Sequence, residues 1–279
     1  MNVSSIMIEN PVTIVIPNTR KEVLRKIVTE NVTGMPVVKR NGELAGMITR
    51  RDLFQNPNEE QLALLMQWDI PRLSPNDSVK KAAKMFLGKN IHHLCVARGK
   101  KLVGFLRPYE LLPAVEAIQS ERLVEEFVGS SCTPVWEGTP LPLIPKIIKI
   151  TSFYALPVLN DEGNLTGIIT DRDLFTSTQI EEVLFKSELG LGDDEDSWTW
   201  EGIRNIMTLF YEEHKLSLPN IPVKEVMVKN PKTVYERSTV AKAARLMRKN
   251  YFGQLPVTNN NDKLVSLIYN NDLLKGLLE

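Results

Sequence analysis

Short apolar runs and amphipathic stretches alternate along the chain in an order that recurs four times. In the first repeat, an apolar run at 11–16 precedes a stretch in which Val23, Leu24 and Ile27 are spaced as on one face of a helix. Thr19 begins a Thr-x-x-Glu capping box, which is typical of the residue that precedes a helix. The pattern therefore predicts a strand followed by a helix with one buried face.

Two further apolar runs, at 35–38 and 44–48, complete the first repeat. Asn41-Gly42 lies between them and predicts a two-residue type I′ turn, because both central residues of that turn need a positive φ. Thr49 then precedes a second helical stretch. The expected unit of the fold is therefore strand, helix, strand, hairpin turn, strand and helix.

The same order recurs in three more places. The second repeat has a helix capped by Asp77 or Ser78 and a hairpin that turns at 98–100. In the third repeat, three prolines between 140 and 145 each remove a backbone donor, so the first helix is expected to begin late, near Leu143. We therefore predict a repeat protein, and self-similarity at a fixed period decides the whole fold.

Each repeat also carries an acid at the same distance from an apolar strand. The separation is 16 residues in all four repeats: Pro36 to Asp52, Leu94 to Glu110, Pro157 to Asp173 and Pro256 to Asp272. Each acid ends a short pattern, Gly-Met-Ile-Thr-Arg-Arg-Asp at 46–52 and Gly-Ile-Ile-Thr-Asp-Arg-Asp at 167–173, with altered copies at 104–110 and 266–272.

The third and fourth repeats are separated by about forty extra residues. This insertion, 178–218, contains an acidic loop at 190–196 and an apolar helical pattern with Trp198 and Trp200 near its start. One interpretation is a helix that packs on its own module. The other is a docking surface or lid for which the two tryptophans are the anchors.

Composition limits the classes of partner. The 279 residues are 43% hydrophobic, which is enough for one large or two medium cores. Lys plus Arg equals Asp plus Glu at 34 each, so no basic field supports binding to nucleic acid or to an anionic membrane. No apolar run approaches the ~20 residues of a membrane span, and the first residues lack the features of a signal peptide. We expect a cytoplasmic protein.

The acids at the ends of the repeats have a purely local interpretation. Thr49-x-x-Asp52 and Thr170-x-x-Asp173 are both capping boxes, which need no ligand. One observation against this interpretation is that the fourth repeat keeps Asp272 although the capping hydroxyl is replaced by a tyrosine.

The cations beside these acids favour a ligand. Arg50, Arg51 and Arg172 lie in the first turn of a helix, where the macrodipole disfavours positive charge. A bound anion would make them favourable, because free amides at a helix N-terminus and a nearby guanidinium form a phosphate site. An acid three residues further on can accept hydrogen bonds from ribose hydroxyls.

Four units of about sixty residues with an apolar-Pro-Val strand and a Gly-x-Ile-Thr-x-x-Asp end resemble CBS domains. The resemblance implies an α/β (α+β) fold of β-α-β-β-α units paired into two Bateman modules that form a flat disk. It assigns module 1 to 1–119, with units at 1–57 and 60–119, and module 2 to 120–279, with units at 120–177 and 219–279 around the insertion. The layout is similar to stand-alone archaeal four-domain proteins and to the γ subunit of AMP-activated kinase.

The same resemblance implies adenosine ligands in clefts between paired units: AMP, ADP, ATP or S-adenosylmethionine. It places ribose on Asp52 and Asp173, and phosphate near four residues at the helix starts, Thr49, Arg51, Thr170 and Arg172. It places adenine against Thr13, Ile14, Met35 and Pro36 in the first unit, and against Thr133, Val135, Leu156 and Pro157 in the third.

The other two units depart from the pattern. Arg107-Pro108-Tyr109-Glu110 lacks the hydroxyl and has a longer acid, so that site is expected to be empty or altered. In the fourth unit bulky Tyr269 stands where phosphate would lie, so Asp272 is expected to hold an adenosine without phosphate, or nothing.

Catalysis finds little support, because no nucleophile, base and orienting acid can be assembled and no His/Cys cluster has metal-ligand spacing. The leading hypothesis is a non-catalytic nucleotide sensor, with or without pairing of two disks, that acts on a separate effector protein. The alternatives are a scaffold with vestigial clefts that docks a partner through 178–218, and a sensor of S-adenosylmethionine. The arginines argue against the last, since a sulfonium brings positive charge.

Overall fold

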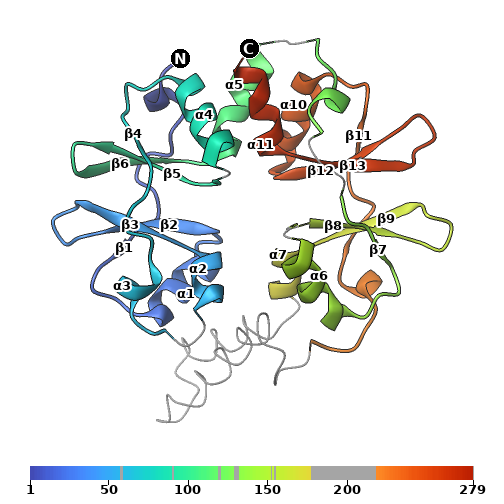
Figure 1. Ribbon diagram of the computed structural model, residues 1–279, viewed down its shortest axis with the longest axis horizontal. Helices are drawn as coiled ribbons and strands as arrows, with labels where there is room; N and C mark the ends of the chain where they lie inside the picture. Colours follow the sequence, from blue (N-terminus) through green and yellow to red (C-terminus); the bar gives the residue numbers. More distant parts are fainter. Residues whose placement is uncertain are drawn as a thin grey trace. The chain divides into compact units, whose positions relative to one another are not determined.

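The computed structural model describes residues 1–56, 59–89, 91–118, 121–128, 132–151, 153, 155–176 and 218–278. The chain divides into two compact units, which Figure 1 shows coloured along the sequence. Unit 1 comprises Met1–Ser130, Thr233–Asn259 and Ser266–Glu279, and unit 2 comprises Ser131–Lys232 and Asn260–Val265. The insertion with Trp198 and Trp200 lies outside the described residues, except for Leu218 at its end.

Repeats 1 and 2 lie wholly within unit 1. Repeat 1, preceded by the 3-10 turn η1 (Val3–Ser5), contains β1 (Ile14–Val15), α1 (Arg20–Thr29), β2 (Gly34–Val38), β3 (Leu44–Thr49) and α2 (Arg50–Gln55), and α3 (Leu62–Leu65) follows in the link. Repeat 2 contains β4 (Arg72–Leu73), α4 (Val79–Lys89), β5 (Leu94–Arg98), β6 (Lys101–Leu106), the 3-10 turn η2 (Pro108–Leu111) and α5 (Leu112–Ala117).

The other two repeats follow the same order. After η3 (Val124–Glu126), repeat 3 contains β7 (Val135–Trp136), η4 (Leu141–Leu143), α6 (Ile144–Thr151), β8 (Ala155–Leu159), β9 (Leu165–Thr170) and α7 (Asp171–Thr176). Repeat 4 contains η5 (Val223–Glu225), β10 (Val228–Lys229), β11 (Val234–Tyr235), α10 (Val240–Asn250), β12 (Gln254–Thr258), β13 (Leu264–Tyr269), α11 (Asn270–Leu273) and η6 (Leu274–Leu277). The predicted α/β repeat architecture is confirmed, and so is the late start of the third repeat's helix.

Each repeat forms a small mixed sheet. The three strands of each repeat pair in the orders β1-β2-β3, β4-β5-β6, β7-β8-β9 and β11-β12-β13. The first strand runs parallel to the second, and in repeats 1 to 3 the second pairs antiparallel with the third. Strand β10 adds a fourth strand to the sheet of repeat 3, antiparallel to β9. Strand β2 is buried along its whole length, as expected for a central strand covered on both faces. The helix between the first two strands makes the parallel pairing possible, since parallel strands need a crossover.

The hairpin turn of repeat 1 differs from the prediction. Gly42 has a φ of +80°, but Asn41 is not among the residues with positive φ, so the expected type I′ turn is wrong. The Gly42 amide instead donates to the Lys39 carbonyl at 2.9 Å, which closes a turn whose last residue is left-handed. Gly163 repeats this geometry with its amide on Asn160.

The strand register also corrects the spacing argument in repeat 2. Pro36 pairs with Met47, and its counterpart opposite Phe105 is Cys95 rather than Leu94. Cys95 precedes Glu110 by 15 residues, because the hairpin of repeat 2 is one residue shorter than that of repeat 1. The acids still occupy equivalent positions, since each lies six residues after the first residue of its motif at 46, 104, 167 or 266.

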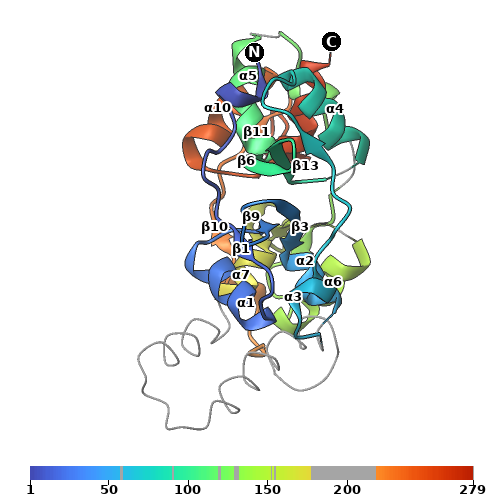
Figure 2. The same ribbon diagram turned by 90° about the vertical axis from the view of Figure 1, so that its left-hand side faces the viewer.

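Two of the hydrophobic cores in the described part of unit 1 join different repeats. In Figure 1 the sheets of repeats 1 and 2 face each other, and buried side chains of both sheets, including Leu44, Met47, Cys95 and Phe105, fill the space between them. Helices α4, α5, α10 and α11 lie side by side in Figures 1 and 2 and enclose a larger core from repeats 2 and 4. Phe86, at 0% exposure, is among its largest side chains. Among the described residues, no helix has the length and apolar character that crossing a bilayer requires.

Candidate ligand-binding site

The segment before repeat 1 pairs with the last strand of repeat 2. Ile8 and Phe105 exchange two backbone hydrogen bonds, of 2.8 and 3.0 Å. Gly104 permits this approach, because a Cβ at that position would overlap the side chain of Met7. The N-terminal segment thus forms one wall of repeat 2.

The link before repeat 2 makes the same contact with repeat 1. Met47 and Gln67 exchange two backbone hydrogen bonds, of 2.9 and 2.8 Å. Here a Cβ at Gly46 would overlap the Gln67 carbonyl and the Met66 side chain. Gln67 therefore occupies the same position beside repeat 1 that Ile8 occupies beside repeat 2.

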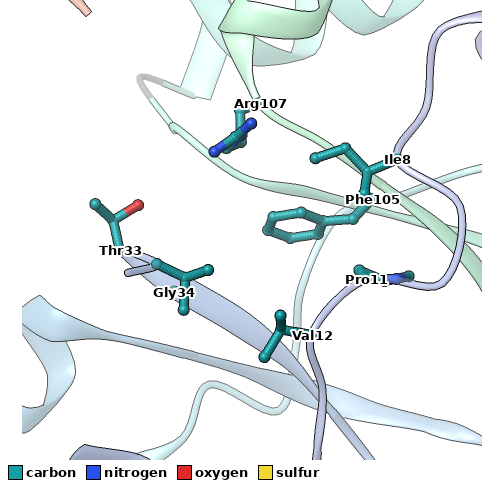
Figure 3. Close-up of a pocket in the computed structure, with 8 residues that line it drawn as sticks. Ile8, Pro11, Val12, Thr33, Gly34, Phe105 and Arg107 are labelled. Atoms are coloured by element: carbon teal, nitrogen blue, oxygen red, sulfur yellow. The ribbon is translucent and has the colours of Figure 1, made fainter. Parts of the chain in front are cut away.

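A pocket opens beside Ile8. Its volume is about 100 Å³, and it is lined by Ile8, Pro11, Val12, Val32, Thr33, Gly34, Phe105 and Arg107. Figure 3 shows the ring of Phe105 between Arg107 above and Val12 below, facing Thr33 across the open space. The walls are apolar, and the polar groups that border the pocket are the Thr33 hydroxyl and the Arg107 guanidinium.

Arg107 is held by Glu110, the acid of repeat 2. The guanidinium donates from Nη2 to Glu110 Oε1 at 2.6 Å, and the Arg107 amide donates to Glu110 Oε2 at 2.7 Å. The Glu110 side chain is 10% exposed, whereas that of Arg107 is 42% exposed. The guanidinium also lies over the Tyr109 ring at 5.8 Å from its centroid. A cation thus stands at the pocket edge and remains accessible.

His93 lies behind the pocket and supports two of its walls. Its Nε2 lies 2.9 Å from the Thr33 hydroxyl oxygen, and its ring stacks on Phe105 with centroids 5.6 Å apart. Burial, and to a smaller extent the nearby charges of His92 and Arg107, lower the pKa of His93 from 6.5 to about 3. A neutral imidazole therefore supports Thr33 and Phe105 from behind at neutral pH.

Both carboxylate oxygens of Asp52, the predicted ribose ligand of repeat 1, already accept hydrogen bonds. The Thr49 amide and hydroxyl donate to its Oδ2 at 2.7 and 2.6 Å. The side-chain amide of Gln67 donates to its Oδ1 at 2.7 Å. Asp52 is 6% exposed. The capping box expected from the local interpretation is formed, and the crossing segment adds a third donor.

The acids of repeats 3 and 4 cap their helices in the same way. The Thr170 amide and hydroxyl donate to Asp173 Oδ2 at 2.8 and 2.7 Å. In repeat 4 the backbone amide of Tyr269 donates to Asp272 Oδ2 at 3.0 Å. Burial raises the pKa of Asp272, and the Tyr269 amide opposes that shift. The argument that Asp272 persists without a capping partner is therefore wrong, because a backbone amide suffices.

The residues predicted to face adenine lie mostly in the core. Ile14 and Met35 are 1% and 0% exposed, and Leu156 is 0% exposed. Pro36, Pro157 and Val135 are also buried, whereas Thr13 and Thr133 are partly exposed. None of these residues lines the pocket at Ile8. Contact of any of them with a ligand stays a prediction.

The predicted phosphate ligands are only partly placed. Thr49 and Thr170 lie at the starts of α2 and α7, with their hydroxyls on the acids. Arg172 is exposed beside Asp173, and the side chain of Arg51 lies outside the description. Repeats 1 and 3 therefore bring hydroxyl and acid together, as predicted, but in mutual hydrogen bonds.

Sequence reasoning missed the residues that line the pocket. Ile8, Val12 and Thr33 precede strands β1 and β2, and Phe105 and Arg107 belong to the altered motif copy at 104–110, whose site is expected from the sequence to be empty or altered. One signal was available: Gly104 corresponds to Gly46, and such a glycine in a strand often marks the close approach of another segment. It does not reveal which segment approaches.

Comparison with known proteins agrees with the repeat structure. The family model described as "CBS domain" matches residues 3–59, 61–117, 124–178 and 223–279, which is most of the chain. A CBS domain-containing protein of Dictyostelium discoideum is 32% identical over 157 residues, covering 56% of this chain and 92% of that relative.

Two solved archaeal structures match over nearly the full length. A conserved protein from Pyrococcus horikoshii matches with a TM-score of 0.68 and 29% identity, covering 100% of both chains. Protein MJ1225 of Methanocaldococcus jannaschii matches with a TM-score of 0.76 and 20% identity, covering 99% of this chain and 100% of that one. With four matched repeats that each fold as a β-α-β-β-α unit, this chain belongs to the CBS-domain family.

Proposed function

We propose that the chain is a regulatory module that binds an adenosine nucleotide, AMP, ADP or ATP, and acts on a separate protein. The observation that carries the proposal is the pocket with apolar walls and an accessible guanidinium at its edge, formed by Ile8, Val12, Phe105 and Arg107. Membership of the CBS family supports adenosine compounds as the ligand class.

The pocket suits the two ends of a nucleotide differently. Its apolar walls favour a flat aromatic base, which can pack against Ile8, Val12 and the Phe105 ring. Arg107 offers paired N–H donors, the arrangement that best matches phosphate. Ligand sites for drug-sized molecules are typically ~300–1,000 Å³. The pocket of about 100 Å³ therefore takes the base, and the ribose and phosphate extend past Arg107.

Binding would rearrange the Arg107–Glu110 pair. A phosphate that engages the guanidinium competes with the Glu110 carboxylate for the same donors. Glu110 released in this way can accept hydrogen bonds from ribose hydroxyls, the role proposed for the acids of the other repeats. The exchange gives the module two local arrangements, and a ligand shifts their balance only through its differential affinity for them.

The positive charge at the pocket edge favours a nucleotide over S-adenosylmethionine, whose sulfonium would face the guanidinium. Asp173 with Thr170 remains the second proposed ribose site. Asp52 with Thr49, the remaining predicted ribose site, already accepts the Gln67 amide on Oδ1. The regulated protein is proposed to be a separate effector chain, and self-association of the module is part of the same proposal.

Calorimetric titration with AMP, ADP, ATP and S-adenosylmethionine tests the proposal. The variant Arg107→Met removes the guanidinium while keeping an apolar stem, and Arg98→Met, at the exposed end of β5, is the matched control. Loss of one hydrogen-bonded charge costs roughly 1.5–3 kcal/mol, so nucleotide affinity should fall about 10- to 150-fold in Arg107→Met only. Equal affinity of the two variants, or no binding of any of the four compounds to the native protein, contradicts the proposal.

A further inference from the structure

Three segments cross the last strand of a neighbouring repeat in the same register. Ile8 lies opposite Phe105 of repeat 2, Gln67 opposite Met47 of repeat 1, and Val228 opposite Ile168 of repeat 3. In each case the strand residue follows the glycine of the repeated motif, so the three crossing residues are equivalent. Their side chains therefore have the same position relative to the acid of the repeat that they cross.

Among these three crossing side chains, only Gln67, which crosses repeat 1, carries a hydrogen-bond donor. Ile8 and Val228 are apolar, whereas the Gln67 amide donates to Asp52 Oδ1 at 2.7 Å. A hydrogen bond to an ionised acceptor is about twice as strong as one between neutral groups. The contact is partly buried, because Asp52 is 6% exposed whereas Gln67 is exposed.

Because of this contact, both oxygens of the Asp52 carboxylate accept hydrogen bonds. Oδ2 accepts from the amide and hydroxyl of Thr49, and Oδ1 accepts from Gln67. Oδ2 already accepts two hydrogen bonds, so paired ribose hydroxyls need both lone pairs of Oδ1 and must displace the Gln67 amide. The open pocket, by contrast, lies beside Ile8, where the crossing side chain has no donor.

We propose that Gln67 is an internal occupant of the Asp52 carboxylate, which closes repeat 1 to a ligand that carries a vicinal diol. The inference rests on the proposed function for the class of ligand. On this proposal, the Gln67 side chain alone closes repeat 1, and equivalent repeats differ in ligand binding because their crossing side chains differ. Val228 supplies the natural replacement, because it crosses repeat 3 at the same register.

Removal of the Gln67 side-chain amide should make Asp52 Oδ1 available to a ligand, and should do more than weaken the fold. Asp52 keeps both donors of Thr49, so its carboxylate stays in place with one oxygen exposed to new donors. The variant Gln67→Val copies repeat 3, and Gln67→Met keeps the length of the side chain without the donor. Gln61→Val changes the same residue type at an exposed position in the same link and is the control.

The experiment counts bound nucleotide. Native protein, the two Gln67 variants, the Gln61 control and a Gln67→Met, Asp52→Asn double variant are titrated calorimetrically with AMP, ADP and ATP in turn. We expect a Gln67 variant to bind one more equivalent than the native protein, and the double variant to lose it. Circular dichroism identifies any variant that does not fold, and the other Gln67 variant then decides.

The outcomes separate the two proposals. An unchanged number of sites in a folded Gln67 variant overturns the role of Gln67, whether or not the native protein binds nucleotide. A native protein that binds nothing overturns the proposed function of the pocket at Arg107, and a Gln67 variant that then binds one equivalent still supports the closure.

Discussion

Lowering the pH from 7 to 5 should destabilise the protein through His93. The imidazole is 9% exposed, stacks on Phe105 and lies within hydrogen-bond distance of the Thr33 hydroxyl. Burial lowers its pKa from 6.5 to about 3, so the folded state keeps it neutral at pH 5. The unfolded chain protonates the same residue below pH 6.5. Stability from His93 is therefore present above pH 6.5 and is lost as the pH falls towards 3.

The size of the loss follows from the unfolded pKa. At pH 5 the unfolded state is 1.5 pH units below 6.5, and each unit corresponds to about 1.36 kcal/mol. After allowing for the small protonation already present at pH 7, the free energy of unfolding falls by about 2 kcal/mol. Carboxylates also change the free energy of unfolding in this pH range. The part that is due to His93 is therefore obtained by comparison with a variant that lacks the imidazole.

Urea unfolding at both pH values, for native protein and His93→Gln, isolates this contribution. The variant keeps a hydrogen-bonding group but cannot titrate, so the native protein should lose about 2 kcal/mol more than the variant between pH 7 and pH 5. Proton NMR of the three histidines provides a second reading, in which the His93 ring should not titrate above pH 5. Equal losses in the two proteins, or a His93 midpoint near 6.5, would refute the reasoning.

Further predictions concern close backbone approach and the contact between helices. Gly46→Ala should lower the free energy of unfolding by about 1–3 kcal/mol, because its Cβ would overlap the backbone of the crossing segment. Gly88→Ala in α4 meets nothing within 4 Å and should raise that free energy by about 0.4–1 kcal/mol; denaturant unfolding of both variants tests the opposite signs. Glu116 pairs with the exposed Arg245 and Arg248 at 2.7 and 3.0 Å, so Glu116→Gln should cost less than about 1 kcal/mol, and the cost should shrink in 1 M salt.

The repeated fold was accessible to sequence reasoning because its signals are local. Strand, helix and hairpin follow from apolar periodicity and turn residues within about sixty residues, and the first helix of repeat 3, α6, begins late because of its prolines. The predictions that were wrong concern local backbone geometry, which apolar periodicity does not determine. Asn41-Gly42 fits a type I′ turn, yet the strands close through a longer turn in which only Gly42 has a positive φ.

The candidate site was harder to predict from the sequence, because it depends on which segments pair with the last strand of another repeat. The spacing of Thr49 and Asp52 predicted their contact correctly, but nothing near Asp52 in sequence indicates that Gln67 reaches it. Likewise, Arg107 departs from the expected motif, although the structure places it at the edge of the pocket. Contacts between a link and a strand of another repeat are long-range, and one sequence gives no measure of them.

The central claim is that an adenosine nucleotide binds in the pocket beside Ile8. Methyl NMR of isoleucine-labelled protein, titrated with AMP, ADP and ATP, tests it directly, with the exposed Ile118 as an internal reference. The account predicts that the Ile8 methyl resonance shifts with a saturating dependence on at least one nucleotide, because an aromatic base would lie against it, while Ile118 stays unchanged. Nucleotide binding that leaves Ile8 unmoved, or no binding at all, would contradict the account.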